Sequence, residues 1–191
     1  MGSAGDILDF WFGARGSPER GTLCSVWFRK DPQFDEEIRR RFGDLHAAAT
    51  RGEFDAWHKA PETLLALVIV LDQFSRNLYR NDPRSWLQDE RALGFAKLAL
   101  VYGNDARIGP VERLFLYLPF EHSENLEDQE RAVLLMASLE AFEETRGFTQ
   151  WAEKHRDVVK RFGRFPHRNA ALGRVSTPEE IEFLKEPGSR F

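Results

Sequence analysis

The sequence predicts an all-α protein, an irregular array of antiparallel helix pairs built by a single domain over residues 1–191. Apolar residues recur at the three- and four-residue spacing of helices, and capping residues precede several of these stretches. No segment has the pattern of a strand pair, a hairpin turn or a βαβ unit. The chain is close to one average domain in length and no Pro/Ser/Gly linker divides it. We expect about seven to nine consecutive helices.

The clearest surface helix begins at Pro32. Asp31 is a suitable N-cap, and proline is favoured at the first helical position because its missing amide proton would be unpaired there anyway. The apolar positions follow one stripe at steps of three or four residues: Phe34, Ile38, Phe42, Leu45 and Ala49. This pattern predicts a helix with one buried face.

The segment after Pro61 is apolar on all sides. Residues 64–71 read LLALVIVL, which suits either a buried strand or the centre of a buried helix. No breaker occurs from Glu62 to about Tyr79, and this length is too great for a typical strand. We therefore predict a central helix, with residues 64–74 as its most buried part.

Two further helices are expected in the middle of the chain. Ser85 can cap a helix that ends near Tyr102, since Gly103 follows it. Pro110 can start a shorter element, and Pro119 is expected to stop it because proline interrupts helical hydrogen bonding.

The last third of the chain predicts three helices. A long helix with an asparagine N-cap is expected over residues 125–146, followed by one with an apolar face over residues 148–162. His155 lies on that face and is interpreted as a hydrogen-bonded core histidine rather than a ligand. Thr177 opens a capping box, so a short helix should cover about residues 178–185.

Charge is unevenly distributed along the chain. The net charge of −4 argues against nucleic acid as a partner. Residues 156–174 hold six basic side chains and one acidic, a sum of +5, so the rest of the chain sums to −9. Residues 121–130 alone contain five acidic side chains and no lysine or arginine.

The cellular location is expected to be the cytoplasm. Cys24 has no second cysteine with which to form a disulfide, which favours a reducing compartment. Residues 1–12 carry two acids and no base before their apolar stretch, unlike a signal peptide. No apolar run reaches the roughly 18 residues that span a bilayer, so no membrane association is expected.

Polar residues interrupt the central helix where burial should continue. Asp72, Gln73, Arg76 and Asn77 follow the eight apolar residues directly. Asp72 and Arg76 lie on the helix side already occupied by Leu65. Buried polar groups need partners or a cavity, so this set either anchors neighbouring loops, emerges into water or lines a pocket.

A second candidate segment is PFEHSE at residues 119–124, just before the helix that Asn125 caps. His122 and Glu124 could act as a general base or as metal ligands, or His122 could be hydrogen-bonded at a helix junction. The spacing matches no established zinc pattern, so we expect neither a metal nor a cofactor. Gln129 lies on the inner face of its helix and needs a buried partner.

The third candidate segment contains Arg164 and Arg168 among aromatic residues and a proline. This composition predicts packed rather than solvated guanidinium groups, which require carboxylates or anionic ligands. The two arginines either neutralise acids of residues 121–130 or hold a bound anion. Nothing in the chain resembles a glycine-rich phosphate loop or a nucleophile elbow.

Several ordered motifs resemble one largely bacterial family, known as domain of unknown function 924. They are FWF at 10–12, WF at 27–28, LDQFSRN at 71–77, PFEHSE at 119–124, FGRFPHRN at 162–169 and LGRVSTPEE at 172–180. The resemblance covers nearly the whole chain. It implies a helical fold similar to tetratricopeptide-repeat folds, and it brings no assigned activity.

Two functional classes follow. The favoured one is a helical binding module whose polar, arginine-rich site takes a peptide, an acidic segment or a small anion, because no activated nucleophile or metal-ligand set is recognisable. The other is an enzyme that uses His122, Glu124 and Asp72 for acid–base chemistry on a small anionic substrate. A closed pocket of small-molecule size with a His–carboxylate hydrogen bond would favour the enzyme, and an open groove the module.

The candidate segments are predicted to meet in space. Unpaired buried charges cost several kcal/mol, and the excess acid and excess base lie in different parts of the chain. We therefore expect the polar end of the central helix, the 121–124 turn and residues 164–169 to converge around Asp72 and Arg76.

Overall fold

The computed structural model describes residues 2–190, and these form helices, turns and loops without a β-strand. The predicted all-α class is confirmed. The α-helices are α1 (Ala4–Phe12), α2 (Pro32–Thr50), α3 (Pro61–Ile69), α4 (Ser75–Leu78), α5 (Asp89–Val101), α6 (Pro110–Glu121), α7 (Leu126–Ala137), α8 (Thr149–Phe162) and α9 (Pro178–Phe183). Within residues 2–190, none of these helices combines the length and apolar character needed to cross a bilayer. The likeness to tetratricopeptide-repeat folds stays a prediction.

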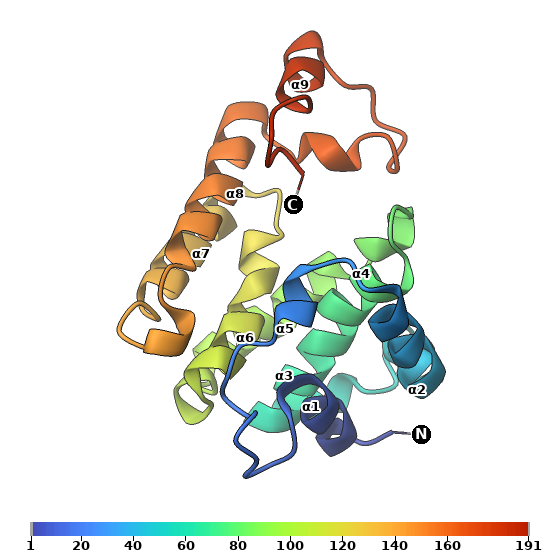
Figure 1. Cartoon of the computed structure of the whole chain (residues 1–191), viewed down its shortest axis with the longest axis vertical. Coiled ribbons are helices and arrows are strands. Elements are labelled where there is room, and N and C mark those ends of the chain that lie inside the picture. Colours follow the sequence, from blue (N-terminus) through green and yellow to red (C-terminus); the bar gives the residue numbers. More distant parts are fainter. Residues whose placement is uncertain (1, 191) are drawn as a thin grey trace.

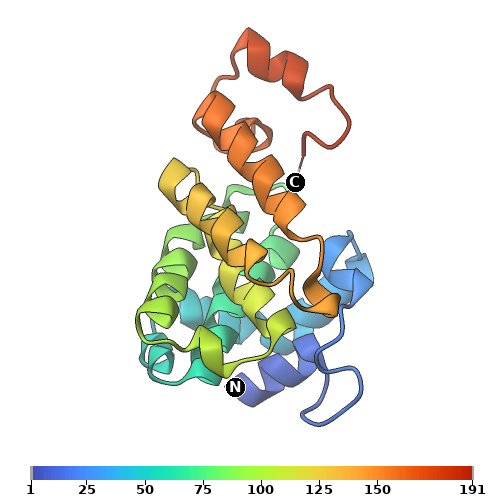
Figure 2. The same ribbon diagram turned by 90° about the vertical axis from the view of Figure 1, so that its left-hand side faces the viewer.

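Helix α3 lies at the centre, with α1, α5 and α6 packed around it (Figure 1). Helix α6 passes from this group to α7, and α7 and α8 lie side by side in both views (Figure 2). Helix α9 lies at the opposite end of the molecule from the N-terminus (Figure 1). The region between α3 and α7 therefore joins the N-terminal and C-terminal parts of the chain.

The central helix is the most buried element, as predicted. Every side chain from Leu64 to Asp72 is fully buried, and so is Phe74. Aromatic rings of α1 and α2 cover this helix, with Phe42 stacked on Phe74 at 5.2 Å between ring centroids. A helix enclosed on every side has no face for unsatisfied polar groups, so each polar group at its end must find a partner.

A second, smaller apolar cluster packs α8, the loop after it and α9 together. Val158, Val159 and Phe165 are buried together, and Phe162 and Phe183 pack against them. Because Phe165 belongs to this cluster, the loop after α8 is held in a fixed position beside the main core.

Three of the predicted helix boundaries are wrong, those at Ser85, Pro119 and Arg146. Helix α5 begins at Asp89, whereas Ser85 lies in a 3-10 turn and donates its hydroxyl proton to the carbonyl of Tyr79. Helix α6 continues through Pro119 to Glu121. Proline removes only one helical hydrogen bond, and the burial of Pro119 and Phe120 offsets that loss.

The predicted long helix over residues 125–146 ends early, at Ala137. Asn125 caps it as expected, accepting from the amides of Glu127 and Asp128. After α7 the chain turns, and the Glu140 carboxylate accepts hydrogen bonds from the amides of Gly147 and Thr149. These hydrogen bonds give the backbone amides of the loop a side-chain acceptor, so the loop forms where the sequence pattern favoured more helix.

Candidate functional site

The central helix widens where its polar residues begin. Residues Val70–Phe74 form a π-helical segment between α3 and α4, and this segment carries Asp72 and Gln73. Single π-helical turns occur frequently at functional sites, because the extra residue re-aims side chains out of the regular helical register. Here the π-helical segment carries a buried carboxylate, whose partners include His122 just after α6, and a buried amide that donates to that carboxylate.

The Asp72 carboxylate has three polar partners, two through hydrogen bonds and one through an ion pair. Nδ1 of His122 lies 2.7 Å from Oδ1 of Asp72, and Nη1 of Arg76 lies 3.1 Å from the same oxygen. Nε2 of Gln73 donates to Oδ2 at 2.6 Å. Burial alone would raise the pKa of Asp72, but Arg76 and His122 hold this pKa well below its usual range. Asp72 is therefore an ionised acceptor in the core.

An ionised Asp72 determines the protonation of His122. Nδ1 must carry the proton that is donated to Asp72, so Nε2 of the neutral ring carries the lone pair. Nε2 has no hydrogen-bond partner among residues 2–190, and the side chain keeps 14% exposure. Burial and the charge of Arg76 lower the pKa of His122, which keeps the imidazole neutral at pH 7.

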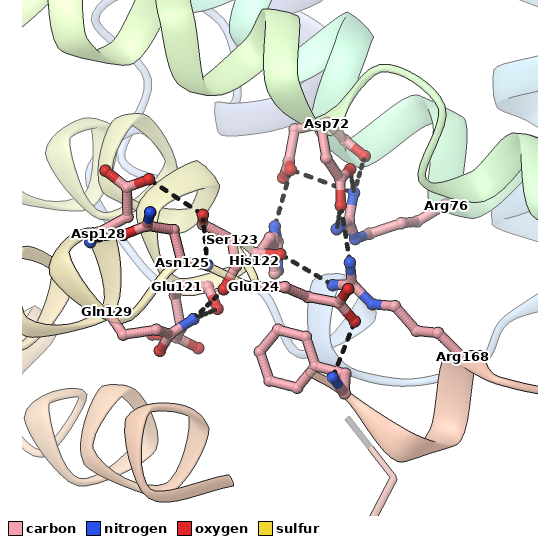
Figure 3. Close-up of polar contacts among 12 residues, drawn as sticks. Asp72, Arg76, Glu121, His122, Ser123, Glu124, Asn125, Asp128, Gln129 and Arg168 are labelled. Atoms are coloured by element: carbon pink, nitrogen blue, oxygen red, sulfur yellow. Dashed lines mark hydrogen bonds and ion pairs between the residues drawn. The ribbon is translucent and has the colours of Figure 1, made fainter. Parts of the chain in front are cut away.

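The turn that carries His122 is anchored by Gln129 of α7. Nε2 of Gln129 donates to the carbonyls of Glu121 and Ser123, both at 2.6 Å. These carbonyls flank His122 on either side, and Gln129 itself is fully buried. Figure 3 shows the amide of Gln129 pointing at this turn. The buried partner that the sequence required is thus the backbone beside His122.

Asp89, at the start of α5, links the two central arginines. Arg76 makes a bidentate pair with it at 2.9 and 3.0 Å, and Nη1 of Arg168 donates to it at 3.2 Å. Nη2 of Arg168 also donates to the carbonyl of His122 at 3.1 Å (Figure 3). Burial lowers the pKa of Arg168 to about 10, which leaves it charged at pH 7.

Glu124 connects the turn to the loop after α8. It accepts the backbone amide proton of Phe165 at 2.8 Å and a bidentate pair from Arg174 at 2.6 and 2.9 Å. The end of the central helix, the 121–124 turn and the 164–169 segment therefore meet, as predicted. Arg174 pairs with Glu124 of the acidic stretch and Lys97 pairs with its Asp128, whereas Arg164 and Arg168 pair with acids outside residues 121–130.

Two of the predicted site residues lie elsewhere. Asn77 donates to Asp35 of α2 at 2.8 Å. Arg164 pairs with Glu180 of α9 at 2.7 and 2.8 Å and donates to the carbonyl of Val175. Asn77 follows the π-helical segment by one turn and faces α2, and Glu180 is a closer acid for Arg164 than any in residues 121–130.

Two members of the site were not singled out by the sequence, although Arg174 is one of the six basic side chains of residues 156–174. An acid in the first turn of a helix, such as Asp89, is ordinarily explained by the helix dipole. Arg174 lies outside the aromatic segment that marked Arg168 as packed. Their roles depend on contacts between residues 13 to 79 positions apart, as in Arg76–Asp89 and Arg168–Asp89.

A second buried acid–histidine pair lies behind His122. Oε1 of Glu121 is 3.1 Å from Nδ1 of His155, and this nitrogen also donates to the carbonyl of Trp151 at 2.8 Å. The prediction of a hydrogen-bonded core histidine is confirmed. Burial raises the pKa of Glu121 to about 8 and lowers that of His155 to about 3, so both groups are neutral at pH 7.

A third buried histidine, His46, lies on the α2 side of the central helix. Its Nε2 is 2.8 Å from the hydroxyl of Ser75, and that hydroxyl donates its own proton to the carbonyl of Leu71 at 2.6 Å. The serine proton is therefore committed to the backbone, and His46 must be the donor of the pair. A serine nucleophile activated by His46 would need the opposite arrangement.

The outer side of the His122 cluster borders a cleft of about 400 Å³. Its polar lining consists of Asp89, Glu90, His122, Ser123, Glu124, Asn125 and Arg168, and its apolar lining of Pro83, Trp86, Leu87, Leu93 and Leu172. This volume lies within the range of small-molecule sites. Within residues 2–190, no group of three or more His, Cys, Asp or Glu side chains is arranged to hold a metal ion.

Comparison with known proteins places the chain in a family. One solved structure, of a protein of unknown function from Agrobacterium tumefaciens, is similar, with 42% sequence identity and a TM-score of 0.84. The match covers 96% of this chain and 97% of that one. No match was found among curated proteins. The family described as bacterial protein of unknown function (DUF924) matches residues 7–188, so the chain belongs to this family.

Proposed function

We propose that this protein is an enzyme that acts on a small molecule by general acid–base catalysis. His122 is the group that transfers the proton, and Asp72 is the group that positions it. The observation that carries the proposal is the 2.7 Å contact between Nδ1 of His122 and Oδ1 of Asp72, with the imidazole on the wall of a cleft of about 400 Å³.

The electrostatics support His122 as a base. A general base must be unprotonated at the working pH, and burial together with Arg76 lowers the pKa of His122. The ionised carboxylate of Asp72 fixes the tautomer and stabilises the imidazolium that forms when Nε2 takes a proton. After that transfer, the same Nε2–H can return the proton to a leaving or product atom.

The rigidity of the surroundings also supports catalysis. Arg76 and Gln73 fix Asp72, while Gln129 and Arg168 fix the backbone on both sides of His122. Catalytic groups need such support, because small displacements of a proton-transfer group reduce rates strongly.

A helical binding module for a peptide, an acidic segment or a small anion is the competing proposal. Such a site would need a guanidinium free to receive the ligand. Arg76, Arg164 and Arg168 each already hold a carboxylate, so they offer less to an anion than their number suggests.

The proposal is tested by incubating purified protein with a small-molecule extract of bacterial cells and comparing the products by mass spectrometry. We expect the wild type to convert at least one compound and His122→Asn to convert it at least about 100-fold more slowly, as for loss of a general base. His58→Asn is the matched control, because His58 is a partly exposed histidine outside the cleft lining, hydrogen-bonded to the carbonyl of Asp55. Conversion by His122→Asn at the wild-type rate, or no converted compound, would contradict the proposal.

A further inference from the structure

The charges around the cleft can be counted pair by pair. Three guanidinium groups border or support it, those of Arg76, Arg168 and Arg174. Arg76 and Arg168 share Asp89, and Arg76 also contacts Asp72. Arg174 is held by Glu124 through two bonds. Each guanidinium is therefore already neutralised by a carboxylate.

One carboxylate of the cleft lining has no guanidinium partner. Glu90 lines the cleft next to Asp89, is exposed, and forms no ion pair with any of residues 2–190. Outside the lining, Arg84 pairs with Asp82 and Lys97 pairs with Asp128, so each of these pairs adds no net charge. With His122 uncharged, the lining and the side chains paired with it hold four carboxylates (Asp72, Asp89, Glu90 and Glu124) and three guanidinium groups, a sum of −1.

The remaining wall of the cleft is apolar and accessible. Leu87 is 64% exposed and Leu172 is 36% exposed, and both line the opening. Trp86 provides an aromatic surface, with the guanidinium of Arg168 at 5.6 Å from its ring. A ligand that covered these side chains would remove apolar area from water.

From this charge count and this wall, we propose that the cleft binds a small amine in its protonated form, with an apolar or aromatic body. The ammonium group lies near the unpaired Glu90, and the apolar body lies against Trp86, Leu87 and Leu172. An anion finds no unpaired cation in the cleft and is repelled by Glu90. This proposal rests on the same site as the proposed catalysis, but it concerns binding and not turnover.

The test uses three probes of one shape and different charge: benzylamine, benzyl alcohol and benzoate. Their dissociation constants are measured at pH 7 by calorimetry and by thermal shift on the wild-type protein. We expect benzylamine to bind at least about tenfold more tightly than benzoate. In NMR spectra, benzylamine should shift the indole Nε1–H signal of Trp86, which is assigned by Trp86→Phe.

Charge variants link the preference to one residue. Glu90→Gln should abolish the preference for benzylamine, and Glu90→Lys should favour benzoate. Glu130→Lys on the exposed side of α7 is the matched control and should leave the order unchanged. Benzoate binding as tightly as benzylamine, or no binding of benzylamine at millimolar concentration, would overturn the inference.

His122→Asn separates this inference from the proposed catalysis. The variant should bind benzylamine as the wild type does, because His122 is neutral and does not provide the charge preference. If the wild type and His122→Asn both prefer benzylamine but the wild type converts no compound, the amine site is supported and the catalytic proposal is refuted. Converted compounds that are all anions would support catalysis and refute the amine site.

Discussion

The carboxyl group of Glu121 lies 3.1 Å from Nδ1 of His155, and both side chains are buried directly behind His122. Burial raises the pKa of Glu121 to about 8, from an ordinary value of 4.5, and the nearby negative charge of Asp72 acts in the same direction. The folded protein thus contains a protonated carboxylic acid at neutral pH, and its stability depends on that proton.

The resulting pH dependence has a definite sign. Between pH 4.5 and 8 the folded state binds a proton at Glu121 that the unfolded state has lost, so this group lowers stability as pH rises. His155 has the opposite effect below pH 6.5, because its pKa is lowered to about 3 on folding. The effect of Glu121 should therefore be clearest between about pH 6.5 and 8.

Glu121→Gln should remove this decline. From pH 6.5 to 8.5, we expect the free energy of unfolding of the wild type to fall by about 1–2 kcal/mol relative to the variant, following the linkage slope of about 1.4 kcal/mol per pH unit. Urea denaturation at several pH values measures the difference. The exposed Glu130→Gln should track the wild type, and parallel curves for Glu121→Gln and wild type would show that Glu121 is ionised in the fold.

Leu67→Ala should destabilise the protein by about 2–5 kcal/mol, because it removes buried methyl groups and leaves a cavity in the fully buried central helix. Thermal or denaturant unfolding measures the change. Leu134→Ala is the matched control, since Leu134 is 63% exposed on α7 and its truncation should cost less than about 0.5 kcal/mol. Equal effects of the two substitutions would contradict the central placement of α3.

Much of the fold is predictable from local patterns. Pro32 after Asp31, Asn125 and Thr177 mark helix starts that the structure confirms, because N-caps depend on side chains within three residues. The ends were less predictable. Pro119 lies inside a helix because of the burial of its neighbours, and such tertiary packing leaves no mark in a local sequence window.

The candidate site was predictable only in part. A buried helix that turns polar at Asp72 implied partners, and charge separation indicated where they lay in the chain. The identity of each partner was not predictable, because Asp89, Arg174 and Glu180 are chosen by tertiary geometry. The π-helical turn also escaped prediction, since the LDQFSRN segment continues the ordinary helical spacing of Leu71, Phe74 and Leu78.

Gln129→Leu tests the anchoring of the His122 turn. The substitution keeps a similar size but removes two hydrogen bonds to carbonyls beside His122, so we expect a loss of about 2–3 kcal/mol of stability. Because the turn would no longer be held by Gln129, the His122–Asp72 hydrogen bond should weaken.

The far-downfield proton signal of His122 Nδ1 in NMR spectra reports this bond directly. We expect the signal in the wild type and its loss or upfield shift in Gln129→Leu. Gln150→Leu is the control because Gln150 is exposed at the start of α8. An unchanged signal in a destabilised Gln129→Leu protein would restrict Gln129 to a structural role.

Arg168→Ala tests whether Arg168 serves to stabilise the fold or to bind an anion. Arg168 is 6% exposed and joins three parts of the chain, through Asp89 of α5, the carbonyl of His122 and the ring of Phe165 at 4.6 Å. Its removal leaves Asp89 with Arg76 alone and leaves the His122 carbonyl without this donor. Removing one partner of a buried ion pair commonly costs about 3–5 kcal/mol, and we expect a loss of this size in the unliganded protein.

Urea unfolding without ligand measures the loss of stability, and thermal shift in phosphate measures anion binding. If Arg168 stabilises the fold, Arg168→Ala should lose much stability. Phosphate should then stabilise neither the wild type nor the variant, because the Arg168 guanidinium is already paired with Asp89. Arg161→Ala is the matched control, since Arg161 forms an exposed pair with Glu179 that should contribute less than about 1 kcal/mol. Strong stabilisation of the wild type by phosphate that disappears in Arg168→Ala, with little change in the unliganded protein, would instead identify Arg168 as an anion-binding group.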